Sequence, residues 1–167
     1  MFNIFRIYQA TTTLVVALFV LNAHGQTNRS TVRKSLSSVC FLMLQDKDDQ
    51  PKKLGSGFFI KPGVIATSLP LLDGVASGYC KVAGSKTRLK IEGIIARDTL
   101  NEVALLKTDD NAAPSLTLTD GIVLTGDEAT ILACPKGLNG EFRNGTISGV
   151  NSRGDNKFYE ITSDILP

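Results

Sequence analysis

The sequence is poor in histidine and has little excess charge of either sign. Its 167 residues hold one His and no Trp, and 18 Lys and Arg stand against 16 Asp and Glu, for a formal net charge of +2. So balanced a charge, with no basic cluster, argues against nucleic acid as a partner. A hydrophobic fraction of 43% and a charged fraction of 20% argue against disorder and fit a packed globular domain.

No apolar run is long enough to cross a membrane as a helix. The longest, residues 14–21, is well short of the roughly 20 residues that a span needs. Arg6 precedes this run and small residues follow it, which is typical of a secretory leader. We therefore predict a signal peptide over residues 1–25, cut between Gly25 and Gln26, and a secreted or periplasmic protein with no membrane association. An uncleaved anchor is the alternative.

Cleavage at this point removes the single histidine, His24. The mature chain then lacks imidazole, the side chain whose ordinary pKa lies near neutrality. It has no histidine to bind a metal, to act as a general base or to activate a Ser or Cys nucleophile. We therefore expect neither a metal site nor a cofactor.

Cysteine is also scarce, and its spacing matches no zinc motif. Cys40, Cys80 and Cys134 lie far apart in the sequence, each within an apolar segment that looks like a strand. We expect three small buried thiols. Because an exported protein meets an oxidising compartment, one disulfide with one free thiol is the alternative, and the sequence does not choose the pair.

From Ser38 onward, short apolar runs alternate with turns rich in Gly, Pro, Asn and Asp. No window has the periodicity of a long amphipathic helix, so the pattern predicts an all-β sandwich or barrel. Ahead of it, residues 26–37 are polar and are expected to form an N-terminal arm. The predicted strands are 39–44, 57–60, 64–67, 79–83, 89–96, 103–106, 129–133, 146–150 and 158–162.

Four segments, in order, resemble trypsin-like serine proteases of the HtrA/Deg type. Residues 55–60 and 63–67 are similar to the family's G-S-G-F-x-I … G-x-I-x-T, which enters the loop that bears the catalytic His. Residues 97–107 resemble R-D … x-D-L-A-V-L-K, whose Asp is the acid of the triad. Residues 133–150 resemble G-x-P-x-G … G-x-V-S, and residues 159–167 resemble the segment that leads into the nucleophile motif.

The resemblance covers about residues 38–167 and implies two six-stranded barrels with a catalytic cleft between them. For this chain it implies a complete first trypsin-like barrel over residues 38–108 and an incomplete second barrel over residues 115–167. A half barrel leaves strand edges and apolar faces uncovered. We expect residues 129–133 and 146–150 to be such faces, with self-association through open edges or strands from another chain as ways to cover them.

The resemblance also places the family's histidine at Pro70, its aspartate at Glu102 and its serine beyond Pro167. A proline side chain accepts no proton, and Glu102 has no imidazole to orient. We therefore expect no functioning catalytic residue. We predict an exported trypsin-fold pseudoprotease, or a serine protease fragment without a catalytic triad, that binds a protein or peptide.

Two other interpretations stay open. The chain is part of an active trypsin-like serine endopeptidase whose serine-bearing segment lies beyond it, or it is an unrelated secreted β-barrel that binds a ligand. A serine paired with a buried lysine is a poor candidate, because the lysines near Ser56 and Ser68 lie in polar segments.

Overall fold

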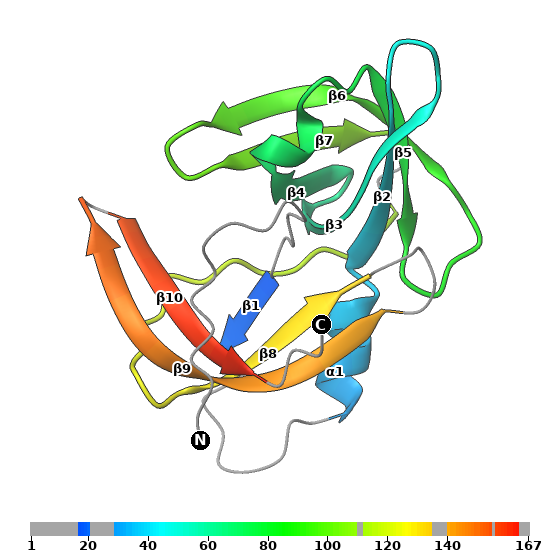
Figure 1. Cartoon of the computed structure of the whole chain (residues 1–167). Helices are drawn as coiled ribbons and strands as arrows, with labels where there is room; N and C mark the ends of the chain where they lie inside the picture. The colour runs from blue at the N-terminus through cyan, green and yellow to red at the C-terminus, as the bar shows by residue number, and fades with distance from the viewer. Residues whose placement is uncertain (1–16, 21–28, 110–111, 135–139, 155, 164–167) are drawn as a thin grey trace.

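The computed structural model describes residues 17–20, 29–109, 112–134, 140–154 and 156–163 (Figure 1). Within them, strands form a closed barrel and a separate four-stranded sheet. The elements in chain order are β1 (Ala17–Val20), α1 (Arg29–Leu36), β2 (Val39–Gln45), β3 (Pro51–Lys61), β4 (Val64–Ser68), η1 (Leu69–Leu72), β5 (Ser77–Val82), β6 (Leu89–Asp98), β7 (Val103–Thr108), β8 (Glu128–Ala133), β9 (Glu141–Arg153) and β10 (Asn156–Ser163).

The all-β class and all the strands predicted from residue 39 onward are confirmed. Most strands are longer than predicted, because hairpin pairing carries polar residues into the ladder. Strand β3 begins at Pro51, in a stretch that the sequence suggested was a turn, since Lys53 pairs with Leu44 across the β2–β3 hairpin. Strand formation depends on packing against cross-strand neighbours as well as on composition, so the composition of this stretch did not reveal the strand.

The barrel closes in the order β2-β3-β4-β7-β6-β5, with every neighbouring pair antiparallel. The sequence of β2 is apolar without alternation because both of its faces are covered. Cys40, Leu42 and Leu44 point into the barrel core, whereas Val39 and Phe41 pack on the outside against α1 and β8. A strand covered on both faces has no position for a polar side chain.

The glycine at position 57 belongs to the segment that resembles the family motif. A Cβ on Gly57 would lie 2.6 Å from Ile65 Cγ2 and 3.0 Å from the Ala66 carbonyl oxygen. The backbone oxygen cannot move without shifting β4, so only glycine fits here. Gly63, in the turn between β3 and β4, has φ of 68°, which is also a glycine conformation.

The polar arm expected over residues 26–37 contains a helix instead. In α1, Val32 is buried and Leu36 partly buried, and they lie four positions apart on the face that packs against Val39 and Leu132. A two-turn helix has too few residues for a hydrophobic stripe to stand out in the sequence. Its stability comes from this packing, since isolated helices of eight residues are marginal in water.

The second sheet has the order β1-β8-β9-β10 and lies below the barrel in Figure 1. Strand β8 is paired on both sides, and it packs through Leu132 against α1 and β2. The expectation that residues 129–133 form an uncovered face is therefore wrong, as Ala129 and Leu132 are each 1% exposed. On β9, Ile147 is 0% and Val150 36% exposed, so residues 146–150 are open only in part.

Strand β1 lies within the predicted signal peptide. Its four residues belong to the apolar run 14–21, and they pair antiparallel with β8. The remainder of residues 1–25, including His24 and the predicted cut between Gly25 and Gln26, lies outside the described residues, as does Pro167. Among the described residues, no helix has the length and hydropathy of a membrane span.

Candidate functional site

The site that the resemblance points to lies where β4 leaves the barrel. Strand β4 ends at Ser68, and the short helix η1 follows with Pro70 in its first turn. A proline suits this position because its fixed φ fits the start of a helix and its missing N–H is not needed there. Leu71 is buried in the barrel core and fastens η1 to the barrel wall.

Glu102 lies in the turn between β6 and β7, directly before β7 begins. Its φ is 56°, which is unusual for a residue other than glycine. The Glu102 carbonyl oxygen accepts a hydrogen bond from the Leu69 N–H, with 2.7 Å between nitrogen and oxygen. The structure thus brings the chain at Pro70 and the chain at Glu102 together through their backbones, while the Glu102 side chain is exposed.

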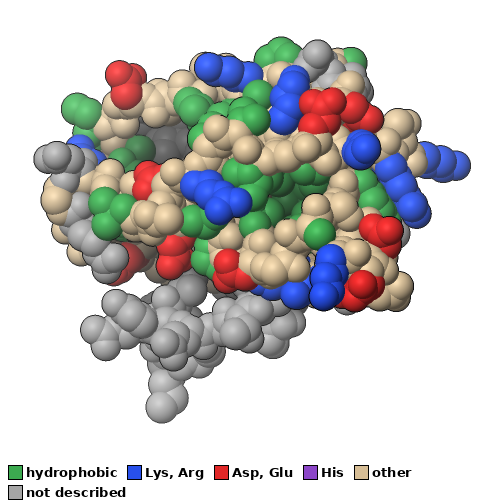
Figure 2. Space-filling model, turned by 90° about the horizontal axis from the view of Figure 1, so that it is seen from above, with side chains coloured by type: hydrophobic (Ala, Val, Ile, Leu, Met, Phe, Trp, Pro, Cys, Tyr) green, Lys and Arg blue, Asp and Glu red, His purple; other side chains and the backbone are tan. Residues whose placement is uncertain are grey.

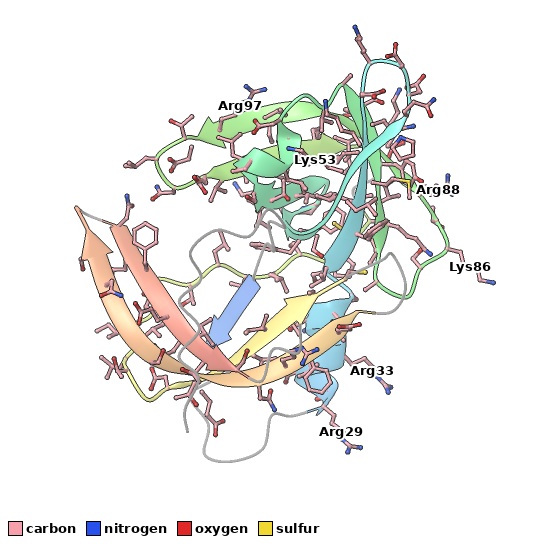
Figure 3. The ribbon with its side chains drawn as sticks, in the orientation of Figure 1. Arg29, Arg33, Lys53, Lys86, Arg88 and Arg97 are labelled. Carbon is pink, nitrogen blue, oxygen red and sulfur yellow. The ribbon has the colours of Figure 1, made fainter. Side chains whose placement is uncertain are left out.

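Lys53 is the charged side chain that contacts η1. Its Nζ donates to the Pro70 carbonyl oxygen at 2.7 Å, from the neighbouring strand β3 (Figure 3). Because the ammonium group is bound to a backbone oxygen, Lys53 holds the end of β4 and η1 in place. No pattern in the sequence predicts this contact, since Lys53 lies in a stretch that is typical of a turn.

Ser56 is placed where it cannot act as a nucleophile on a substrate. Its side chain is 4% exposed, and its Oγ accepts the Cys134 N–H at 3.2 Å. Its carbonyl oxygen accepts the Thr67 hydroxyl at 3.1 Å. Ser56 therefore joins three parts of the fold: β3, the end of β4, and the chain that follows β8.

The turn that presents Glu102 is built around Asp98. The Asp98 carboxylate accepts the backbone N–H groups of Leu100 and Asn101, each at 3.0 Å, and the Asn101 side-chain amide at 2.6 Å. The hydrogen bond from the Asn101 side chain, followed by that from the Asn101 backbone, holds the Asp98 pKa below its ordinary value; desolvation opposes the shift, and the Leu100 backbone bond adds to it. An Asp followed by Asn three positions later is a turn signal that sequence reading can use.

The three cysteines are buried free thiols. Cys40 and Cys80 lie in the barrel core, and Cys134 lies in the cluster between the barrel and the second sheet. Burial raises the pKa of Cys40 well above its ordinary value, and the neighbouring Cys80 thiol raises it further. Burial also raises the pKa of Cys134, although Lys81 nearby opposes that shift.

One face of the molecule carries charged side chains of both signs. On the face seen in Figure 2, hydrophobic side chains gather in the middle, and Lys and Arg lie beside Asp and Glu around them. In the part of the chain that the structure describes, no three His, Cys, Asp or Glu residues are grouped to hold a metal ion. The face seen in Figure 2 is therefore one of mixed charge.

The chain is similar to part of a known protein, but the comparisons do not assign it to a family. No protein-family profile matches the chain. Over 109 residues, 64% of its length, the chain is 32% identical to a protein of Halomonas elongata named "Probable periplasmic serine endoprotease DegP-like". The chain spans 23% of the length of that relative. The similarity and the closed six-stranded barrel together mark a distant homology to HtrA-like serine endoproteases.

Proposed function

We propose that this chain is an exported, trypsin-fold pseudoprotease, or a protease fragment without a catalytic triad, that serves as a scaffold for binding a protein or peptide. The observation that carries the proposal is the backbone contact between Leu69 and Glu102. This hydrogen bond joins Glu102 to the residue before Pro70, and Pro70 and Glu102 are the residues that the resemblance matches to the family's histidine and aspartate.

A serine protease needs a serine oxygen, an imidazole that takes its proton, and a carboxylate that orients the imidazole. Pro70 has no atom that accepts a proton in its side chain, and Glu102 has an exposed carboxylate. The only histidine of the sequence is His24, inside the predicted leader. Loss of the base alone costs orders of magnitude in rate, so the scaffold is expected to be inert toward peptide bonds.

A second candidate is part of an active serine endopeptidase. It is favoured by the name of the relative from Halomonas elongata and by the fact that the chain spans 23% of that protein. In that case the serine-bearing segment follows Pro167, and another residue supplies the base. Reading the gene beyond the Pro167 codon distinguishes the two: a Gly-x-Ser-Gly-Gly segment in frame supports this candidate, and an immediate stop codon opposes it.

The catalytic part of the proposal is tested with the purified protein. We expect no cleavage of fluorescent casein above the buffer rate and no covalent labelling of this chain by a fluorophosphonate, with an active trypsin-like protease as the positive control. Mass spectrometry identifies which protein carries any label, so a contaminating protease is recognised. Casein turnover together with a fluorophosphonate adduct on a serine of this chain contradicts the proposal.

Export is tested separately. We expect the protein recovered from the periplasm of a bacterial host to begin at Gln26, as read by N-terminal sequencing. The name of the relative, which includes the word periplasmic, supports this location. A protein that is recovered only from the cytoplasm, with residues 1–25 still attached, contradicts it.

A further inference from the structure

Strand β1 occupies an edge of β8 that the predicted maturation would vacate. Residues 17–20 pair with β8 in the register Ala17 to Leu132 through Val20 to Ala129. The same residues form the middle of the apolar run that we predict is removed on export. One segment cannot both be removed and stay paired, so cleavage leaves this edge of β8 with unpaired N–H and C=O groups.

The edge of β8 that β1 occupies corresponds to a strand position that is filled in the barrel. In the barrel, the first strand β2 pairs with the second strand β3 and with the fourth strand β5. In the second sheet, β8, β9 and β10 follow each other as first, second and third strands, and β1 pairs with the free side of β8. Strand β1 thus takes the place, beside the first strand, that the fourth strand takes in the barrel.

The part of the acceptor strand that pairs with β1, residues 129–132, is mostly buried and uncharged. Ala129, Ile131 and Leu132 are buried, and Leu132 packs against α1 and β2. On the other side, β8 is fixed by its ladder with β9, where the Thr130 hydroxyl donates to Asn144 Oδ1 at 3.2 Å. The paired residues 129–132 carry no charge, and neither do residues 17–20. A strand that is uncharged and apolar therefore suits this edge.

We propose that the edge of β8 is a strand-accepting site, which the leader segment Ala17–Val20 fills until it is removed and which then binds an extended, uncharged, apolar segment of another protein. Backbone hydrogen bonds supply the affinity, as in other cases of strand addition, and the absence of charge selects apolar segments. This inference rests on the proposed function, because it requires that the leader be cleaved.

The test compares two forms of the protein: the full chain, and the processed chain recovered after export. The probe is a fluorescent peptide with the sequence of residues 14–21, made soluble by lysines at both ends. Its matched control is the same peptide with N-methyl groups on alternate residues, which removes backbone donors and leaves the side chains. We expect the processed chain to bind the probe at least about tenfold more tightly than it binds the control, and more tightly than the full chain binds the probe.

Equal binding of the probe and its N-methylated form, or equal binding by both forms of the protein, overturns the proposal. So does a folded processed chain that binds neither peptide. If the N-terminus shows that no cleavage occurs, the proposed export fails instead, and the two failures are thus distinguished. The processed chain could also form dimers. Dimers that the probe dissociates support the proposal, because a second copy then competes with the probe for this edge. Dimers that the probe leaves intact count against the proposal.

A second measurement covers the case in which the processed chain does not fold. Leu18→Pro in the full chain removes a backbone donor from β1 and opens the edge without shortening the protein. We expect the amides of residues 129–132 that face β1 to exchange faster with solvent in this variant and to regain protection when the probe is added, while those that face β9 stay protected. Unchanged exchange in Leu18→Pro, or no recovery with the probe, contradicts the proposal.

Discussion

Ser56 has a nucleophilic type of side chain, but in this fold its role is structural. Its hydroxyl oxygen is buried and accepts the Cys134 N–H, and its carbonyl oxygen accepts the Thr67 hydroxyl. These bonds connect the barrel to the chain that follows β8, so their loss affects both strand systems. A buried polar group that loses its partner costs more than an exposed one, because water cannot replace the bond.

We predict that Ser56→Ala lowers the free energy of unfolding by about 1–3 kcal/mol, since it removes the acceptor of a buried N–H. Urea unfolding of the full chain, followed by circular dichroism, measures the change. Ser77→Ala is the matched control, because the Ser77 hydroxyl is exposed and bonds only to Asp49 Oδ1 at 3.4 Å. The control is expected to stay within about 0.5 kcal/mol of the parent. Equal changes in the free energy of unfolding would show that the buried hydrogen bond of Ser56 contributes no more to stability than the exposed one of Ser77.

The position of Pro70 beside Glu102 also depends on main-chain contacts. The bond from Leu69 to Glu102 and the bond from Lys53 to the Pro70 oxygen both end on carbonyl groups. Such bonds do not depend on which side chain stands at position 70 or 102.

Between β6 and β7, the turn is held by one carboxylate, Asp98, whose folded pKa lies below its ordinary value. A group with a depressed folded pKa stabilises the fold at pH values above its unfolded pKa, and this contribution disappears as the pH falls through the folded pKa. The hydrogen bonds to the Asp98 carboxylate should therefore hold the turn at neutral pH and be lost only in acid. Because Asp98 is at the surface, the effect is local to the turn that presents Glu102.

We predict that Asn101→Ala raises the Asp98 pKa toward its ordinary value, since the Asn101 side chain is the largest cause of the depression. An NMR titration of the Asp98 carboxyl carbon measures the shift. Asn156→Ala, at the start of β10 in the other sheet, should leave the Asp98 titration unchanged. An Asp98 pKa that is the same in Asn101→Ala and in the parent contradicts the assignment.

The strands were predictable because each combines a short apolar run with a flanking turn signal, and β2 is the clearest case. Helix α1 was not, because only Val32 and Leu36 mark its buried face within a polar segment. The pairing of β1 with β8 was not predictable either, since a run of apolar residues fits a leader and a strand equally well. Length and flanking residues favoured the leader, and no local signal reports a partner strand more than 100 residues away.

For the site, motif order pointed to Pro70 and Glu102, and in the structure Glu102 accepts a backbone hydrogen bond from Leu69, the residue before Pro70. The way in which they are held was beyond sequence reasoning. Lys53 reaches the Pro70 oxygen from a hairpin strand that begins at Pro51, earlier than its composition suggests. Hairpin length is set by cross-strand pairing rather than by composition.

The barrel and the second sheet are joined through a small shared cluster. It contains Phe41 and Val39 from the outer side of β2, Val32 from α1, Leu132 from β8, and Cys134. Cys40, in contrast, lies in the interior of the barrel. A reagent reaches Cys134 when the two strand systems separate, and reaches Cys40 only when the barrel itself opens.

We therefore predict an order of thiol reactivity for the native chain. Cys134 should be alkylated by iodoacetamide at pH 8 before Cys40, because the junction opens more readily than the barrel and because the pKa of Cys40 is raised well above its ordinary value. Mass spectrometry of labelled peptides over time measures both rates, and raising the pH should speed both, as more thiolate forms.

In denaturant without reductant, all three cysteines should react, as free thiols do. Reaction of only one cysteine under those conditions would mean that the other two form a disulfide, and a faster reaction of Cys40 than of Cys134 would mean that the barrel opens first.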